Sequence, residues 1–171
     1  AKAYLYAVPY ELYEKYGVRR YGFHGTSHRY VSARALEFLG MKAEGTKVVT
    51  AHIGNGGSLA AVVDGKCVDT TMGLTPLEGV MMGTRSGDID GGAVAFIQKK
   101  LGLDADGISD LLNKKSGIAG LTGLSSDMRD IENAANAGNE RAQIAQDSYF
   151  YRIKKYVGAD AAAMGGIDVL D

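Results

Sequence analysis

The sequence has 171 residues, of which 46% are hydrophobic and 23% charged, a balance typical of a globular protein with a buried core. The formal net charge of −1 gives no electrostatic reason to expect a nucleic acid or an anionic membrane as a partner. A single cysteine, Cys67, excludes an internal disulfide, and no apolar run reaches the roughly 20 residues that span a bilayer. Because the N-terminus also lacks a basic and apolar leader, we expect a cytoplasmic protein.

The first 40 residues predict two helices. Residues 3–16 contain five tyrosines and a short helix that ends at Gly17. A second helix is expected over 28–39, with Ser27 as its N-cap and Gly40 at its end. Its apolar face is expected to consist of Tyr30, Val31, Ala35, Leu36 and Leu39.

Residues 48–71 predict three strands in a meander. The first strand runs over 48–52, and the Asn55-Gly56 pair turns the chain into a second strand at 59–63. Asp64-Gly65 makes the next turn, and 66–71 forms the third strand. The short turns predict antiparallel pairing throughout.

The second half of the chain is predicted to be mostly helical. Three shorter helices are expected near 90–101, 105–114 and 127–136, followed by a long helix over about 140–163. Residues 167–170 begin a buried strand that stops at the last residue. A strand cut after about four residues indicates that the sequence is a piece of a longer chain.

Residues 54–58, Gly-Asn-Gly-Gly-Ser, join the first two predicted strands and allow two interpretations. Asn-Gly is a common hairpin sequence, so a plain turn would explain them. Alternatively, backbone N–H groups of consecutive glycines converge on an anion and form a phosphate-binding loop. The stretch is not a Walker A motif, since no Gly-Lys-Ser/Thr follows, and not a dinucleotide fingerprint, since no helix follows.

His24 and His28 are four residues apart, a spacing found in zinc sites. The predicted helix begins only near His28, so the two rings need not share a helical face. Ser27 lacks the Gly-x-Ser-x-Gly setting of a nucleophilic serine. The remaining alternatives for His24 are a structural role and a hydrogen-bond donor to an anion, and the donor role suits a helix N-terminus.

Arg85 stands among small and apolar residues, after Met81-Met82-Gly83 and before Ser86-Gly87. Surface arginines usually have polar neighbours, so this setting favours an arginine at the edge of a cleft. Its rigid, always charged guanidinium suits a transferring phosphoryl group. Asp88 is a candidate partner that would hold Arg85 in place.

Two Asp-x-Asp-Gly stretches, at 88–91 and 104–107, resemble calcium-binding loops. Their twelfth positions are Lys99 and Lys115, where such a loop requires a bidentate Glu, so a calcium site is excluded. These aspartates are better interpreted as the starts of helices. Cys67 is expected to be a small core residue of the third strand.

Two small-residue loops together with one histidine and one arginine indicate phosphoryl transfer, which proceeds by positioning and charge stabilisation. The residues of these segments, and the order in which the segments follow, resemble the acetate kinase family. The similar stretches are 20–28 (Arg-Tyr-Gly-Phe-His-Gly-Thr-Ser-His), 51–58 (Ala-His-Ile-Gly-Asn-Gly-Gly-Ser) and 72–90, with weaker similarity from 126–129 to 165–166. The resemblance covers essentially the whole chain.

The resemblance implies the fold of the acetate and sugar kinase, heat-shock chaperone and actin superfamily. We therefore expect an α/β fold with an incomplete ribonuclease-H-like (actin-like ATPase) core, made of a three-stranded antiparallel meander and several helices. Residues 1–171 would then be a single partial domain, most of the C-terminal kinase domain of a longer protein. The family's N-terminal domain would precede this stretch, and a Gly-rich adenosine loop would follow it.

The resemblance also implies roles for single residues. His24 and Arg85 match residues that stabilise the transition state, and His28 matches a structural histidine. The residues that match the loop at the ATP phosphates are His52, Ile53, Gly54, Asn55 and Gly56, and those that match the wall of the nucleotide pocket are Asp127, Met128 and Arg129.

The implied reaction is reversible transfer of the γ-phosphoryl group of ATP to acetate, giving acetyl phosphate and ADP. The chemistry requires Mg²⁺, whose protein ligands in the family lie outside these residues. A homodimer is the expected assembly, and the isolated piece is expected to be inactive. Two alternatives stay open: a butyrate or propionate kinase, and a non-catalytic nucleotide-binding module of the actin-like type.

Overall fold

The computed structural model describes residues 2–171, and the chain divides into two compact units. The first unit contains the chain up to Glu78 and again from Lys154 onward, and the second is Gly79–Ile153. The expectation that residues 1–171 form most of one domain of a longer protein stays a prediction.

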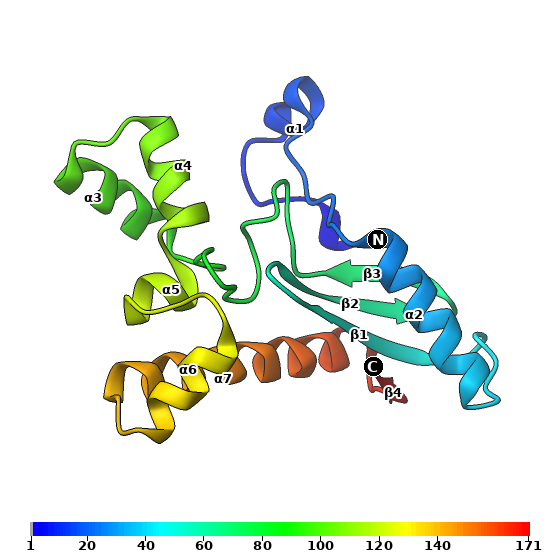
Figure 1. Ribbon diagram of the computed structural model, residues 1–171. Helices are drawn as coiled ribbons and strands as arrows, with labels where there is room; N and C mark the ends of the chain where they lie inside the picture. Colours follow the sequence, from blue (N-terminus) through cyan, green and yellow to red (C-terminus); the bar gives the residue numbers. More distant parts are fainter. Residues whose placement is uncertain (1) are drawn as a thin grey trace. The chain divides into compact units, whose positions relative to one another are not determined.

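The first unit is built on a four-stranded sheet with the order β3-β2-β1-β4 (Figure 1). Its strands are β1 (Lys47–Ile53), β2 (Gly57–Val63), β3 (Lys66–Thr70) and β4 (Val169–Leu170). The first three pair antiparallel, so the predicted meander is confirmed. The fourth pairs parallel to β1, with Val169 opposite Val48, and continues the sheet beyond the meander. The resulting mixed α/β fold agrees with the predicted fold class.

Helices η1 (Lys2–Tyr4), α1 (Tyr10–Tyr16) and α2 (Gly25–Phe38) precede the sheet. As predicted, α1 ends at Gly17, which adopts the left-handed conformation with φ 64°. Helix α2 begins three residues earlier than predicted, and its N-cap is His24 rather than Ser27. The Ser27 prediction is wrong because the hydroxyl of Ser27 bonds to His52 instead of to the helix backbone.

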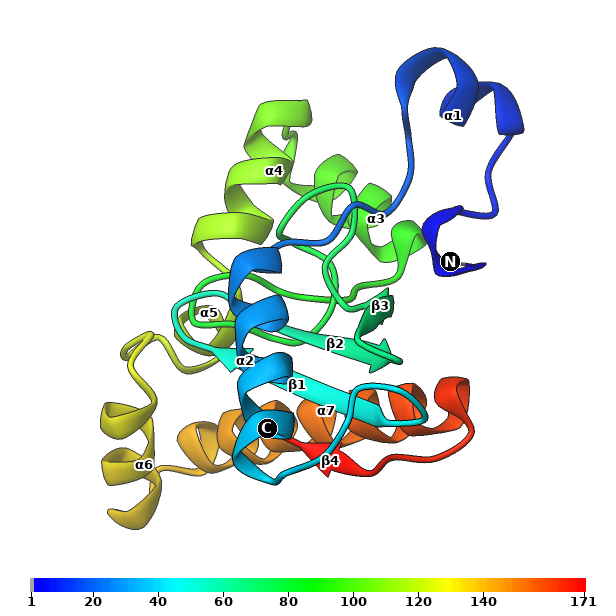
Figure 2. The same cartoon turned by 90° about the vertical axis from the view of Figure 1, so that its right-hand side faces the viewer.

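Helix α2 lies on one face of the sheet, and the last part of α7 (Glu140–Met164) lies on the other (Figure 2). Leu36 of α2 joins Val48, Val62 and Val169 in one buried cluster. The apolar face predicted for α2 is only partly right, since Tyr30 and Leu39 are exposed. The helix turns small and polar side chains toward the sheet instead, and its buried residues are His28, Ser32 and Leu36.

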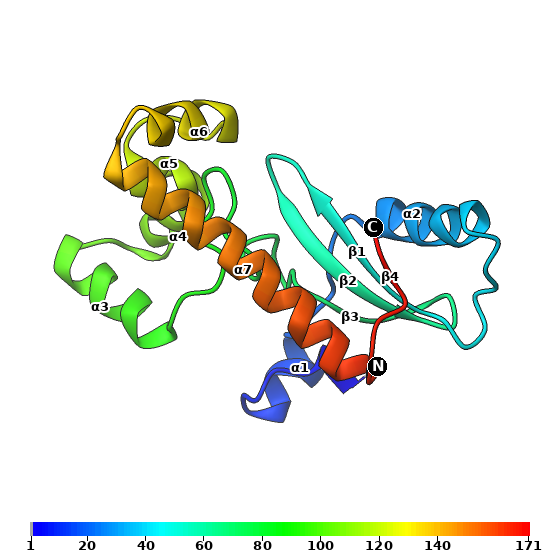
Figure 3. The same ribbon diagram turned by 90° about the horizontal axis from the view of Figure 1, so that it is seen from below.

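The 25-residue helix α7 runs from orange to red in Figure 3 and carries one unusual side chain. Asp160 is 4% exposed, and its Oδ2 has no hydrogen-bond partner. Burial, together with the charge of Asp69, raises the pKa of Asp160 to about 6. Asp160 is therefore a destabilising residue whenever it is ionised.

The second unit is helical and contains α3 (Gly91–Leu101), α4 (Ala105–Lys114), α5 (Gly117–Thr122), α6 (Met128–Asn136) and the first part of α7. All but α5 were predicted. Asp90 and Asp104 cap α3 and α4 by accepting hydrogen bonds from Ala93 N–H and Gly107 N–H, which confirms them as helix-start residues. The core of this unit is a cluster of Met81, Ile118, Ile131 and Ala142.

Two further observations concern residues 2–171 as a whole. No helix among them is long and apolar enough to cross a membrane. Cys67 lies on β3 as predicted, but it is exposed, so its assignment to the core is wrong. The short strand β3 is the last strand on its side of the sheet, and only part of its surface is covered.

Candidate functional site

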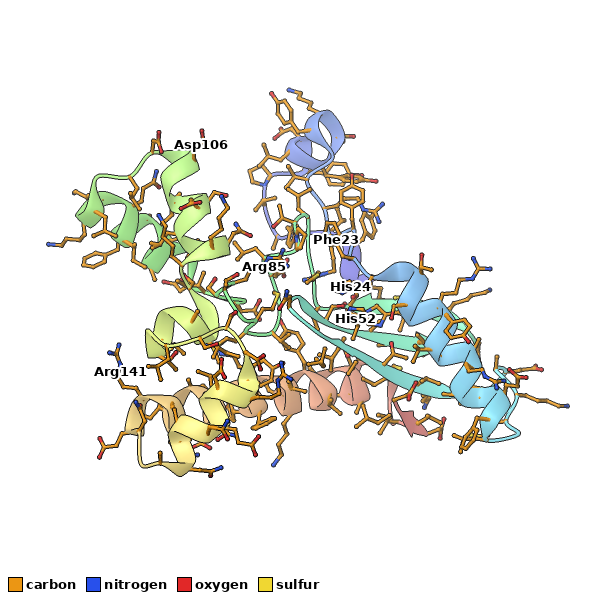
Figure 4. The ribbon with its side chains drawn as sticks, in the orientation of Figure 1. Phe23, His24, His52, Arg85, Asp106 and Arg141 are labelled. Atoms are coloured by element: carbon orange, nitrogen blue, oxygen red, sulfur yellow. The ribbon has the colours of Figure 1, made fainter. Side chains whose placement is uncertain are left out.

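The three histidines of the chain lie together where the N-terminus of α2 meets the end of β1 (Figure 4). The rings of His24 and His52 are stacked, with centroids 3.9 Å apart and planes inclined by 15°. His28 lies edge-on to both rings at 6.3 Å. The structure therefore joins residues 24 and 52, which the sequence assigned to two different loops.

The conformation of His24 is part of this arrangement. Its φ of 59° puts a residue with a side chain into the left-handed region. Such a backbone costs on the order of 1–3 kcal/mol and persists only where surrounding contacts maintain it. The turn presents the ring at the start of the 14-residue helix α2, beside backbone N–H groups that favour an anion.

Each imidazole is held at Nδ1 by a hydroxyl group. The Nδ1 atoms of His24 and His28 lie 2.7 Å from Ser58 Oγ and from Thr50 Oγ1, respectively. His52 Nδ1 lies 2.9 Å from Ser27 Oγ. His28 is also bound at its other nitrogen, because Nε2 lies 2.8 Å from the same Ser58 Oγ.

His28 is the buried member of the cluster, 6% exposed. Burial lowers its pKa to about 4, and the neighbouring His24 and His52 act in the same direction. His28 is therefore neutral at physiological pH and serves as a fixed hydrogen-bonding group. This environment suits the structural role that the sequence assigned to it.

The glycine loop at the end of β1 is a short turn between Ile53 and Gly57, which are paired. The N–H of Gly54 donates to the carbonyl of Gly56 at 2.9 Å. This N–H is therefore already engaged within the turn. The turn is not of the two-residue type I′, since none of residues 54–57 has a positive φ.

Arg85 lies in the second unit, on a loop that is closed at its base. The N–H of Asp88 donates to the carbonyl of Gly79 at 2.9 Å, and the Asp88 carboxylate accepts from the N–H of Gly79 at 2.8 Å. The guanidinium of Arg85 lies 3.9 Å from the sulfur of Met82. Asp88 thus stabilises the loop that presents Arg85.

Helix α5, which the sequence analysis missed, docks on this loop. The N–H groups of Ser116, Ile118 and Ala119 donate to the carbonyls of Thr84, Met82 and Gly83 at 2.9–3.0 Å. Gly117 has φ 63°, and a Cβ there would lie 2.2 Å from the Met82 carbonyl oxygen. Only glycine fits this close approach, so Gly117 helps to fix the backbone around Arg85.

Asp127, Met128 and Arg129 form the start of α6. The Asp127 carboxylate caps the helix by accepting from the N–H of Arg129, and it also binds the Arg129 guanidinium through two bonds of 2.6 and 3.0 Å. This contact with Arg129 lowers the pKa of Asp127 to about 2. Met128 packs against the core cluster of the second unit.

A comparison with known sequences decides the family. The profile of the acetokinase family matches residues 1–170. The chain belongs to the acetokinase family. The acetate kinase of Bacteroides thetaiotaomicron is 69% identical over 168 residues, which is 98% of this chain and 42% of that protein.

Solved structures of acetokinase-family members agree with this assignment. The crystal structure of Porphyromonas gingivalis acetate kinase superposes with a TM-score of 0.97 at 62% identity and covers 99% of this chain. A propionate kinase from Francisella tularensis gives a TM-score of 0.93 at 44% identity and also covers 99%. The chain spans about two fifths of the length of these relatives, 42% and 43% respectively.

The sequence motifs of this acetokinase-family chain contain the three histidines, the glycine loop and Arg85. They did not indicate the hydroxyl groups that hold the imidazole rings. Thr50 and Ser58 were interpreted only as strand residues or part of a turn. Their signal in the sequence is weak, because buried hydroxyls are common in strands and only the fold shows what they contact. Among residues 2–171, no group of three or more His, Cys, Asp or Glu side chains is arranged to hold a metal ion.

Proposed function

We propose that the protein is an acetate kinase, which transfers the γ-phosphoryl group of ATP reversibly to acetate and gives acetyl phosphate and ADP. In this reaction an acetate oxygen forms a bond to the γ-phosphorus as the bond to the ADP oxygen breaks. The proposal is carried by the stacked pair of His24 and His52, 3.9 Å apart, at the glycine loop and at a helix N-terminus. This arrangement gathers donors for an anion in one place.

The residue roles follow the family motifs. His24 and Arg85 stabilise the charge that develops on the transferring phosphoryl group. The residues that bind the ATP phosphates are His52, Ile53, Gly54, Asn55 and Gly56, and those that line the nucleotide pocket are Asp127, Met128 and Arg129. Among the residues of the nucleotide pocket, Met128 packs against the core of the second unit. The exposed guanidinium of Arg129 is oriented by Asp127.

Mg²⁺ is part of the proposal because the metal neutralises the phosphate charge in this chemistry. Following the family resemblance, we propose that its protein ligands lie outside residues 1–171. We also propose a cytoplasmic homodimer that uses no nucleic acid or membrane partner. The homodimer can be checked by light scattering of the full-length protein.

The main alternative is a propionate or butyrate kinase. It is favoured by the structural similarity to a propionate kinase, although that protein is less similar in sequence, at 44% identity against 62% for an acetate kinase. A non-catalytic nucleotide-binding module of the actin-like type is a weaker alternative, since such a module has no use for charge-stabilising donors beside its phosphate loop.

The test compares kcat/KM for acetate, propionate and butyrate in the full-length protein with ATP and Mg²⁺. We expect a graded preference for acetate, since each additional methylene group changes binding by only about 1–3 kcal/mol. Equal or higher efficiency with propionate or butyrate would favour the alternative acyl kinases. Nucleotide binding without turnover of any of the three acids would favour the non-catalytic module.

A further inference from the structure

A continuous chain of hydrogen bonds leads from the core to His24. Thr50 Oγ1 lies 2.7 Å from His28 Nδ1, and His28 Nε2 lies 2.8 Å from Ser58 Oγ. The same Ser58 oxygen lies 2.7 Å from His24 Nδ1. Thr50, His28 and Ser58 are 1%, 6% and 0% exposed, whereas His24 is partly exposed. This buried series of hydrogen bonds thus ends at the ring of His24, at the N-terminus of α2.

The donor-to-acceptor direction is the same in all three of these hydrogen bonds. A neutral imidazole has one N–H, so His28 donates at one nitrogen and accepts at the other. The Ser58 hydroxyl has one hydrogen, so it donates in one of its two bonds and accepts in the other. Only two arrangements therefore exist: the donors run from Thr50 to His24, or from His24 to Thr50.

The two arrangements differ in what His24 offers to a ligand. When the donors run toward His24, its Nδ1 accepts from Ser58 and a neutral ring carries its proton on Nε2. When the donors run away from a neutral His24, its Nδ1 carries the proton and its Nε2 is unprotonated. Only the first arrangement lets a neutral His24 donate a hydrogen bond through Nε2.

Two features favour a neutral His24, and an anion at the start of α2 would then favour donors running toward it, because only that arrangement leaves a proton on Nε2. The positive end of the α2 dipole disfavours a positive charge on His24. In addition, the Nδ1 partners described for the three rings are hydroxyls, which do not stabilise an imidazolium as a carboxylate does.

We propose that Ser58 is the positioning residue that selects the tautomer of His24: its hydroxyl, fixed by His28, donates to His24 Nδ1 and so keeps the proton on Nε2. The kinetic part of this inference rests on the proposed function, in which His24 donates to the phosphoryl group. His28 and Thr50 act through Ser58 and touch no substrate. The arrangement resembles in principle the orienting groups that fix the tautomer of other functional histidines.

The tautomer can be measured directly by NMR of the protein labelled with ¹⁵N at its imidazoles, with His24, His28 and His52 assigned by through-bond correlation. At neutral pH and without substrate, His24 should show an unprotonated Nδ1 and a protonated Nε2. An Nδ1–H tautomer or an imidazolium at His24 would overturn the inference. Because this measurement needs neither turnover nor a variant, its result is independent of the proposed function.

Kinetics of Ser58→Ala test the consequence, with Ser32→Ala as the matched control. Ser32 is a similarly buried serine, 6% exposed, whose hydroxyl donates to the carbonyl of Arg29 rather than to a histidine. Ser58→Ala should lower kcat about 10–100-fold with little change in KM for ATP, as is typical when an orienting partner is lost. It should also reduce the Nε2–H form of His24, and Ser32→Ala should do neither.

The outcomes separate the two proposals. Unchanged kcat in Ser58→Ala, or equal losses in both variants, would overturn the positioning role even if the protein is a kinase. If Ser58→Ala does not fold, the tautomer in the unaltered protein still decides. An Nε2–H tautomer in a protein without kinase activity would support the hydrogen-bond chain and refute the proposed function instead.

Discussion

His24 and Arg85 are each held in place by neighbouring groups. His24 has a left-handed backbone and a ring held by Ser58, while Arg85 belongs to a loop closed by Gly79 and Asp88. Both placements limit the freedom of a charged or donating group before any ligand arrives. Such preorganisation is what makes electrostatic stabilisation of a transition state effective.

Replacing His24 or Arg85 by alanine in the full-length protein should therefore lower kcat far more than it alters KM for ATP. A loss on the order of 10²–10³-fold is expected for one preorganised donor. Steady-state kinetics of His24→Ala and Arg85→Ala provide the measurement, with circular dichroism as the control for folding. Near-full kcat in Arg85→Ala would assign Arg85 a structural role.

His28 and Asp160 make opposite contributions to the dependence of stability on pH. The folded pKa of His28, about 4, is below its ordinary 6.5, so its contribution is present above about 6.5 and is lost as pH falls through about 4. The folded pKa of Asp160, about 6, is above its ordinary 3.8, so its contribution is present below about 4 and is lost as pH rises through about 6. Each shift corresponds to on the order of 3 kcal/mol, so the two largely cancel.

Single variants should separate these contributions. We expect Asp160→Asn to be more stable than the parent at pH 7 and to lose stability as pH falls from 6.5 to 4, because only the His28 contribution remains. His28→Gln should show the opposite slope over the same range. Urea unfolding at several pH values measures both, and parallel curves for the two variants would contradict the assignment.

The sequence pointed to candidate site residues but did not describe their surroundings. His24, His52 and Arg85 stand in long motifs of unusual composition, and these motifs can be read without a structure. Ser58 and Thr50 could not be identified, because a hydroxyl in a strand has no pattern that reveals a partner 30 or 22 residues away. Asp160 was missed for a similar reason, since a helical period does not show that a carboxylate lacks a partner.

At the scale of elements, α5 determines the backbone around Arg85. It has six residues, begins with a glycine of positive φ, and contains a second glycine, Gly120. Its sequence therefore has low helix propensity, which explains why only tertiary contacts define it. The three strands and the longer helices were predictable because their turn residues and apolar periods agree with their final environment.

Gly117→Ala should destabilise the protein more than Gly123→Ala does. Both glycines have left-handed backbones, with φ of 63° and 69°. In both variants the unfavourable conformation of alanine therefore lowers the free energy of unfolding by about 1 kcal/mol. Only at Gly117 would the new Cβ meet backbone atoms, 2.2 Å from Met82 O and 2.7 Å from Arg85 O, whereas nothing lies within 4 Å at Gly123. Urea unfolding gives the two free energies, and equal losses would show that the loop adapts freely.

At the scale of the whole molecule, residues 1–171 carry two compact units with separate hydrophobic clusters. They contain the stacked imidazoles, the glycine loop and Arg85, but no cluster of metal ligands among the described residues. Phosphoryl transfer needs the metal, the nucleotide pocket and the acceptor site together. Possession of some of these parts is not sufficient for turnover.

We therefore predict no measurable acetate kinase activity and at most weak ATP affinity for residues 1–171 alone. A coupled assay on the purified polypeptide, with mass spectrometry to exclude contaminating full-length protein, provides the test. The full-length protein at the same molar concentration is the positive control. Turnover in the ordinary kinase range of about 1–100 s⁻¹ would show that these residues hold a self-sufficient active site.

The parallel pairing of β1 with β4 has a consequence for synthesis of the protein. β1 ends at Ile53, while its partner begins only at Val169, 116 residues later. At about 5–20 residues per second, the ribosome needs on the order of 6–23 s to make the intervening chain. Throughout that interval this edge of β1 lacks its partner strand and can pair with another chain. The nascent protein thus passes through a period of vulnerability to aggregation, which ends only when β4 emerges.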